Sequence, residues 1–171
     1  AFLSAPKDRR DLLLLQRKPE VDASIILKGD YGNFNEMVLR VKQAKDLFLI
    51  IGPPGTGKTS FGMLNTVKEE LLEQDSSVLI MSYTNRAVDE ICSKLLEEES
   101  TCDFIRIGGD LSCSEAYRDH LLSEKVATIN NVDGLKRLLR STRIFVGTTT
   151  SMNSHLSLLK MKQFSLAVID E

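Results

Sequence analysis

One stretch of this sequence constrains the fold more than any other, and it runs from residue 52 to residue 59. It fills every fixed position of G-x-x-x-x-G-K-[ST], the pattern of a phosphate-binding loop. Its residues are Gly52, Pro53, Pro54, Gly55, Thr56, Gly57, Lys58 and Thr59. An apolar run at 47–51 precedes the loop, and apolar residues at helical spacing follow it from Phe61 to Leu71. The sequence therefore predicts a buried parallel strand over 47–51, then the loop, then a helix.

Such a loop binds the phosphates of a nucleoside triphosphate. Its glycines let the backbone bend so that N–H groups point inward, and the following helix adds unpaired N–H groups and a positive dipole end. We expect nucleotide contacts from Gly52 through Ser60. Lys58 is expected to reach the β- and γ-phosphates, and the Thr59 hydroxyl to bind Mg²⁺. The alternative, a plain Gly/Pro turn, is disfavoured because both flanks of the motif also fit.

Composition places the chain among globular proteins of one domain. It has 171 residues, of which 42% are hydrophobic and 27% charged, and its formal net charge is −2. Any nucleic-acid contact must therefore come from a local cleft and not from a basic body. Cys92, Cys102 and Cys113 form no C-x-x-C pair, which indicates a reducing compartment, so we expect a cytoplasmic protein without a membrane partner. A zinc site from Cys102, Cys113 and His120 is disfavoured by their spacing.

Further apolar runs alternate with helical patterns along the rest of the chain. They are predicted to form strands at 78–81, 104–107, 144–146 and 166–169. This alternation predicts right-handed β-α-β units and therefore an α/β fold with a parallel sheet covered on both faces. Ligands bind at the carboxyl ends of such strands. There the sequence places the phosphate loop, Thr84-Asn85, Thr148-Thr149 and Asp170-Glu171.

The N-terminal part is less informative. Its patterns favour a helix at 8–16, a strand at 24–27 and a helix from Asn33 or Asn35 to Ala44. We expect residues 1–32 to be a lead-in segment and residues 33–171 to form the phosphate-loop domain, with a helical insertion at about 110–141.

The end of the chain carries a second element of nucleotide chemistry. Four apolar residues followed by Asp170 and Glu171 form a Walker B pattern. In that role Asp170 holds Mg²⁺, while Glu171 orients and deprotonates the attacking water. Alone, the pair is most simply a polar strand end. With the phosphate loop upstream, the nucleotide role is favoured, and Glu171 and Lys58 are the candidate catalytic residues.

In this order and spacing the sequence resembles the first, RecA-like motor domain of a superfamily 1 helicase. The resemblance covers roughly residues 33–171 and is greatest to the group that contains the nonsense-mediated-decay RNA helicase and the nuclease-helicase of Okazaki-fragment processing. The similar stretches are Gly52–Thr59 for motif I, Thr84–Asp89 for motif Ia, Val146–Ser151 for motif Ic and Val168–Glu171 for motif II.

The resemblance implies an ATP-dependent helicase or translocase that binds ATP with Mg²⁺ and single-stranded DNA or RNA. It also implies that Thr84, Asn85, Thr148 and Thr149 contact the backbone of that strand. Taken alone, these residues are most simply helix caps and strand ends, and Thr84 or Asn85 can cap the helix predicted after 78–81. Hydroxyls, amides and helix N-termini suit this role, because they bind phosphates without reading the base sequence.

The chain departs from the family at two places. The family has an adenine-recognising glutamine upstream of the first strand, where this sequence has Phe34-Asn35-Glu36, and Gln43 lies too close to the strand. The family's γ-phosphate-sensing glutamine, arginine fingers and second motor domain would lie beyond Glu171. An arginine finger is worth on the order of 10³–10⁵ in rate, so the isolated chain is expected to be weakly active or inactive.

Other functions stay open at this point. An AAA+ type ATPase shares the loop sequence, but Lys58 and Asp170 lie about twice as far apart as the matching residues of that class, and the stretch Thr84–Asp89 fits helicases better. A nucleotide-gated binding module that does not hydrolyse ATP is a further alternative.

The last strand leads to a structural expectation. In the fold that the chain resembles, the strand after Walker B inserts between 47–51 and 166–169. Without that strand, two rows of backbone N–H and C=O groups would face a gap. We therefore expect the segment 166–171 to be displaced or poorly ordered, or its edge to be filled by another chain, with Asp170 and Glu171 out of catalytic register.

Overall fold

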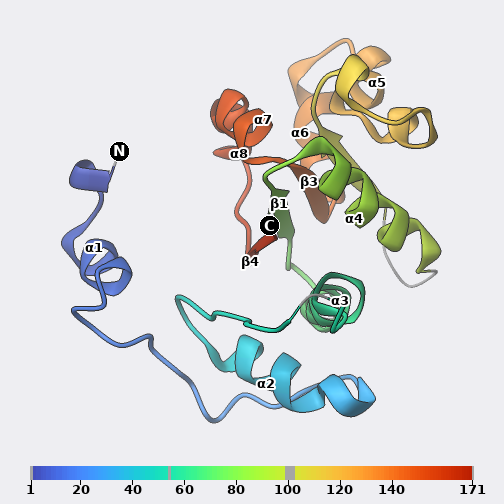
Figure 1. The fold of residues 1–171 in the computed structure, drawn as a ribbon. Helices are drawn as coiled ribbons and strands as arrows, with labels where there is room; N and C mark the ends of the chain where they lie inside the picture. The colour runs from blue at the N-terminus through green and yellow to red at the C-terminus, as the bar shows by residue number, and fades with distance from the viewer. Residues whose placement is uncertain (1, 54, 99–102, 171) are drawn as a thin grey trace.

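The computed structural model of the chain describes residues 2–53, 55–98 and 103–170, and its described part contains a sheet of four parallel strands (Figure 1). The spatial order of the strands is β2-β3-β1-β4. They are β1 (Val78–Ser82), β2 (Phe104–Ile107), β3 (Ile144–Thr148) and β4 (Leu166–Asp170). Each lies where an apolar run predicted a strand, and the α/β fold with a parallel sheet is confirmed.

The register of the sheet places the strand ends in one row. Ser82, the last residue of β1, is paired with Thr148 of β3 on one side and with Asp170 of β4 on the other. Residues in register point to the same face of a sheet. These three side chains therefore leave the sheet together at its carboxyl edge, where the sequence predicted the ligands to bind.

One face of the sheet is covered by the helices that follow the phosphate loop and β1. These are α3 (Leu64–Leu71), which continues a π-helical segment at Lys58–Met63, and α4 (Asn85–Glu97). Val67 of α3 and Ile91 of α4 are fully buried in one cluster with Val78 and Ile80 of β1. Burying a side chain of this size contributes about 1.5–3 kcal/mol, so the helix that carries the loop is held firmly on the sheet.

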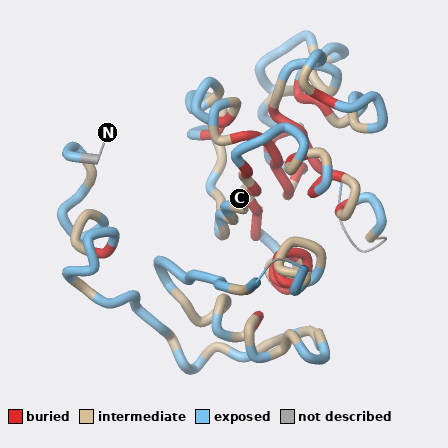
Figure 2. The backbone as a smooth tube through the Cα atoms, in the orientation of Figure 1, coloured by how far each residue is buried: buried red, intermediate tan, exposed pale blue. Residues whose placement is uncertain are grey.

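The opposite face is covered by helices from the second half of the chain. These are α5 (Leu122–Ala127), α6 (Val132–Ser141), α7 (Thr149–Ser154) and α8 (Leu156–Leu159). Phe145 of β3 packs there with Leu139 and Met152. Short 3₁₀ segments at Asp110–Ser112 and Glu115–His120 join β2 to α5, so residues 110–141 are mainly helical. Figure 2 shows most of the buried residues gathered in the sheet and on the helix sides that face it.

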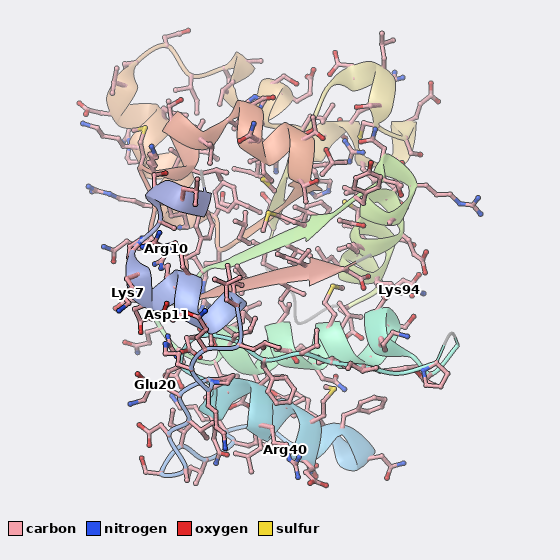
Figure 3. All side chains as sticks on the ribbon, turned by 60° about the vertical axis from the view of Figure 1, so that its left-hand side comes forward. Lys7, Arg10, Asp11, Glu20, Arg40 and Lys94 are labelled. Carbon is pink, nitrogen blue, oxygen red and sulfur yellow. The ribbon has the colours of Figure 1, made fainter. Side chains whose placement is uncertain are left out.

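The N-terminal third holds α1 (Lys7–Leu13) and α2 (Asn35–Gln43), joined by irregular segments. Both helices confirm a predicted helix, although α1 ends before Gln16 because Leu15 adopts a left-handed φ of 58°. Figure 1 shows α1 set apart from the sheet. In Figure 3, Lys7, Arg10 and Asp11 of α1 lie on the opposite side of the view from Lys94 of α4.

The predicted strand at 24–27 is wrong. Asp22 Oδ1 accepts hydrogen bonds from the N–H and the hydroxyl of Ser24, which forms a turn at this point. Ile26 beyond the turn is 77% exposed. Because no strand among the described residues pairs with this stretch, its apolar residues gain nothing from an extended ladder.

The predicted strand at 47–51 is also wrong. The segment joins no strand in the described part of the sheet, and Leu49 and Ile51 are 73% and 85% exposed. A groove of about 650 Å³ lies between this segment and β4. A strand needs a neighbour for its backbone N–H and C=O groups. The outer edge of β4 lies across the groove and does not supply one.

The expectation that the Walker B segment would be displaced is wrong for its described residues. β4 pairs with β1 over its whole length, from Leu166 to Asp170. The segment that stands apart is 47–51 instead. That another chain fills the open edge of β4 stays a prediction.

The cysteines behave as ordinary buried thiols. Cys92 and Cys113 are free and buried, and burial raises the pKa of Cys92 to about 12 and also raises that of Cys113, so neither thiol is reactive. Cys102, a member of the disfavoured zinc trio, lies outside the described residues. Within the described ranges, no group of three acidic, His or Cys side chains could hold a metal, and no helix is long and apolar enough to cross a membrane.

Candidate nucleotide and nucleic-acid site

The phosphate loop bends at two glycines. Gly55 and Gly57 have φ angles of 78° and 79°, in the left-handed region that favours glycine. The Thr56 hydroxyl donates to the Pro53 carbonyl at 2.8 Å and closes the loop on itself. The sequence motif therefore forms the tight turn that its glycines predicted.

Lys58 reaches back into this loop. Its Nζ donates to the carbonyl oxygens of Gly52 and Pro53, at 2.5 and 2.9 Å. Carbonyl oxygens are neutral, whereas phosphate oxygens are charged and form hydrogen bonds to an ammonium that are about twice as strong. A polyphosphate in the loop would therefore replace the carbonyls as partners of Lys58. Pro54, predicted as a nucleotide contact, lies outside the described residues.

The helix after the loop begins with donors that have no acceptor in their own helix. Phe61 and Gly62 both donate to the Gly57 carbonyl, at 2.8 and 3.0 Å. The N–H groups of Ser60 and the two residues before it precede this first closed turn, so they cannot bond within the helix. Such N–H groups and the positive end of the helix dipole attract anions. The turn is π-helical, a form found often at functional sites.

The two predicted metal ligands are in contact. Thr59 Oγ1 donates a hydrogen bond to Asp170 Oδ2 at 2.8 Å. The contact forms because β4 follows the register of β1 to its end. A hydroxyl and a carboxylate are oxygen ligands of the kind that Mg²⁺ prefers, so this pair fits that ion. The expectation that Asp170 would be out of register is therefore wrong, and Glu171 lies outside the described residues.

Ser82 stands in the same row, and the sequence analysis missed it. It lies in register between Asp170 and Thr148 and is fully buried, and its Oγ has no hydrogen-bond partner in the part of the chain that the structure describes. A buried hydroxyl without a partner costs roughly 1–3 kcal/mol. The one signal in the sequence was a polar residue at the end of an apolar strand.

Thr84 and Thr148 cap the helices that leave the same edge. Thr84 Oγ1 accepts from the N–H of Ala87 at 3.2 Å, and Thr148 Oγ1 accepts from the N–H of Ser151 at 3.1 Å. Helix capping, the simpler alternative for these residues, is therefore what both hydroxyls do in this structure. Any contact that these residues make to a nucleic-acid strand would have to leave the capping hydrogen bond in place.

Asn85 and Thr149 are the first residues of α4 and α7. The Asn85 side chain is exposed, and Thr149 is half-buried. Since β1 and β3 are neighbours in register, the structure brings both helix starts to one edge of the sheet. This edge is continuous with the Thr59–Asp170 contact, because β1 also pairs with β4.

Residues 34–144 match the protein family described as AAA domain. The chain belongs to this family. The match begins at the turn before α2 and ends where β3 begins, so it includes the phosphate loop, β1, α4 and β2.

The chain is also similar to helicases. It is 38% identical over 92% of its length to the DNA replication ATP-dependent helicase/nuclease JHS1 of Arabidopsis thaliana, and 28% identical over 98% to the DNA replication ATP-dependent helicase/nuclease DNA2 of Saccharomyces cerevisiae. It is 31% identical over 78% of its length to the DNA polymerase alpha-associated DNA helicase A of Schizosaccharomyces pombe. The chain spans 11%, 10% and 21% of these three relatives. The resemblance to a superfamily 1 motor domain is confirmed, and its link to the nonsense-mediated-decay helicase stays a prediction.

In this AAA domain, the stretch Thr84–Asp89 divides into an exposed start and a structural end. Asp89 Oδ1 accepts a hydrogen bond at 2.9 Å from Arg106, which is fully buried in β2 and also donates to the Ser112 carbonyl at 2.9 Å. A buried charge is tolerated only when it is paired, so Asp89 fixes α4 to β2. Arg106 was not predicted as part of such a pair, although a lone charge within the apolar strand Phe104–Ile107 is a signal for one.

Glu69 fixes the helix that carries the loop to the N-terminal part of the chain. Its buried carboxylate accepts from the N–H groups of Lys28 and Gly29 and from the Tyr31 hydroxyl, each at 2.9 Å, and forms an ion pair with Lys42 of α2. Burial raises the pKa of Glu69, but the hydrogen bonds from Lys42 and the two N–H groups outweigh burial and lower it. No local sequence pattern predicts this network, because its members are far apart along the chain.

Proposed function

We propose that the chain is the part of a helicase motor that binds ATP with Mg²⁺ at the phosphate loop and single-stranded DNA at the ends of β1 and β3. The observation that carries this proposal is the contact between Thr59 and Asp170. The Thr59 hydroxyl of the loop and the Asp170 carboxylate lie 2.8 Å apart. Two oxygen ligands placed in this way would suit the metal ion that accompanies a nucleoside triphosphate. DNA is favoured over RNA because the relatives are named as DNA helicases.

Each residue of the nucleotide site has a defined role in this proposal. Lys58 and the first N–H groups of its helix bind the phosphate oxygens and offset their charge. Thr59 and Asp170 would hold Mg²⁺, which would supply further positive charge to offset that of the phosphates. Glu171 accepts the proton of the attacking water. The negative charge on the γ-phosphate in the transition state would also need an arginine to stabilise it. We propose that a second motor domain supplies this arginine.

The proposed site for single-stranded DNA, at the carboxyl ends of β1 and β3, would contact phosphates and not bases. Because the hydroxyls of Thr84 and Thr148 cap their helices, the contacts would come from the Asn85 amide and from backbone N–H groups at the starts of α4 and α7. Ser82 of β1 lies in register between Thr148 and Asp170. The proposed DNA site and the nucleotide site therefore meet at the carboxyl end of β1. This continuity is the physical basis for coupling between the nucleotide and the strand.

Calorimetry of ATP with Mg²⁺ tests the nucleotide part. Lys58→Ala is expected to abolish detectable binding, because the ammonium that reaches into the loop is removed. Lys160→Ala, which removes an exposed lysine after α8, is the matched control and should bind as the unchanged chain does. Equal affinity of Lys58→Ala and the control would contradict the proposal.

ATP hydrolysis by the full-length protein, with and without single-stranded DNA, separates a motor from a binding module. Stimulation by the strand supports the helicase. Tight ATP binding with no hydrolysis under either condition would favour the nucleotide-gated module instead.

A further inference from the structure

A pair of aromatic rings lies beside the phosphate loop without a role in the site described above. Phe34 ends the 3₁₀ turn before α2, and Phe61 lies in the first turn of the helix after the loop. Their ring centroids are 5.8 Å apart with an angle of 25° between the planes, so the rings are stacked. Phe34 is half-buried, but Phe61 is 58% exposed.

The ring of Phe61 is in contact with the loop itself. A Cβ added to Gly57 would lie 2.7 Å from Cδ2 of Phe61, which shows that the ring covers the Cα of that glycine. Gly57 precedes Lys58, and its carbonyl accepts the Phe61 N–H at 2.8 Å. A nucleotide whose phosphates occupy the loop would therefore have an aromatic surface within reach of the rest of its structure.

This surface offers stacking and little else. A ring as exposed as that of Phe61 forgoes much of the stabilisation that full burial would contribute. Asn35, the neighbouring amide, is already used inside the chain: Oδ1 accepts from the Tyr31 N–H at 2.6 Å, and Nδ2 donates to Asp30 at 2.8 Å. The pair Phe34–Phe61 therefore presents a flat apolar face, and the Asn35 amide beside it is engaged within the chain.

We propose that Phe34 and Phe61 form the platform on which the base of the bound nucleotide stacks. The proposal rests on the nucleotide function proposed above and adds its base specificity. Every base has an aromatic face, so stacking contributes affinity without selecting one base. The ligand class is thus nucleoside triphosphates in general, with ATP and GTP bound to a similar extent.

The test compares nucleotides with a ligand that lacks the nucleoside. The chain is titrated by calorimetry with ATP, GTP and inorganic tripolyphosphate, each with Mg²⁺. Stacking of a base is worth about 1–3 kcal/mol, so Phe61→Ala should weaken ATP and GTP by about tenfold and leave tripolyphosphate unchanged. Phe61→Trp should retain or improve nucleotide binding, whereas Phe61→Leu, which keeps the apolar contact with Gly57, should weaken it as Phe61→Ala does.

Tyr83→Ala, which removes an exposed aromatic residue at the carboxyl end of β1, is the control and should change none of the three affinities. Equal weakening of ATP and tripolyphosphate in Phe61→Ala would show that the ring only supports the loop, and would overturn the proposal. Unchanged ATP binding in that variant, or a preference of the unchanged chain for ATP over GTP above about 100-fold, would overturn it too. Failure of the unchanged chain to bind any of the three ligands would instead refute the nucleotide function itself.

Discussion

Two short apolar runs border the groove of this molecule, and they have different structures. Leu166–Asp170 forms β4, whereas 47–51 forms neither a helix nor a strand. In β4, Leu166, Val168 and Asp170 are half-buried and alternate with two exposed residues, because one face packs on the core. In the other run Leu49 and Ile51 are exposed. Both runs are rich in apolar residues, so the available neighbour decides: β4 has β1 to pair with, and 47–51 has no neighbour in the described part of the sheet.

This difference also explains how the site is assembled. Pairing with β1 carries Asp170 to the carboxyl edge, where it meets Thr59. The loop is not brought there by a strand before it. The loop is positioned by the helix that follows it. This helix packs on the sheet through α3, and the Glu69 network joins α3 to α2. The paired strands, including β1 and β4, therefore form the rigid part of the site, and the loop is attached to them through α3.

Matched charged substitutions in the two runs give the largest expected contrast. Val168→Asp places a carboxylate against the buried cluster and should lower the free energy of unfolding by about 3 kcal/mol. Leu49→Asp places the same group on an exposed residue and should change it by less than about 0.5 kcal/mol. Urea unfolding measures both. Similar losses for the two variants would show that 47–51 is packed like a strand.

The Glu69 network gives the next largest effect. Glu69→Gln should cost about 2 kcal/mol at neutral pH, since buried donors lose a charged acceptor. The pKa of Glu69 is lowered from its ordinary value of 4.5, so its contribution is full above that value and is lost as the pH falls through the folded pKa. The difference between the unchanged chain and the variant should therefore shrink as the pH falls below 4.5. Glu70→Gln, on the next residue of α3, is the control, and a difference that stayed constant with pH would contradict this assignment.

A smaller effect, on the binding of single-stranded DNA, is expected at Asn85, where α4 follows the paired strand β1. Asn85→Ala in the full-length protein should weaken binding of single-stranded DNA about threefold to tenfold, and equally for all sequences, because phosphate contacts carry no base information. Fluorescence anisotropy with oligonucleotides of different composition measures this. A loss confined to one sequence would count against backbone recognition.

The smallest effect is expected at Ser82. Its hydroxyl has no partner among the described residues, so Ser82→Ala should leave the free energy of unfolding unchanged within about 0.5 kcal/mol or raise it. Ile80→Ala in the same strand, at a fully buried position, should cost about 2–5 kcal/mol. A large loss in Ser82→Ala would reveal a hydrogen bond that holds the row together.

Local patterns predicted much of this structure, and non-local ones were missed. The run at 104–107 and the Thr84 cap of α4 were correct, because apolar runs and caps are encoded within a few residues. The run at 47–51 has an equally good local pattern, but its state depends on a neighbour that no window of sequence contains. The partners of Glu69 and Arg106 and the stacked ring of Phe61 were missed for the same reason. The roles of the motif residues stay predictions, and these rest on a spacing that the chemistry of the phosphate fixes.

The most direct test of the account is a double-mutant cycle on Thr59 and Asp170, with calorimetric titration of ATP in the presence and absence of Mg²⁺. If the two side chains hold one metal ion, Thr59→Ala and Asp170→Asn should each weaken Mg²⁺-dependent binding by about tenfold or more, and the double variant should be little worse than either. Binding without Mg²⁺ should be affected far less. Full additivity of the two losses, or equal losses with and without Mg²⁺, would contradict the claim that the loop and the end of β4 form one nucleotide site.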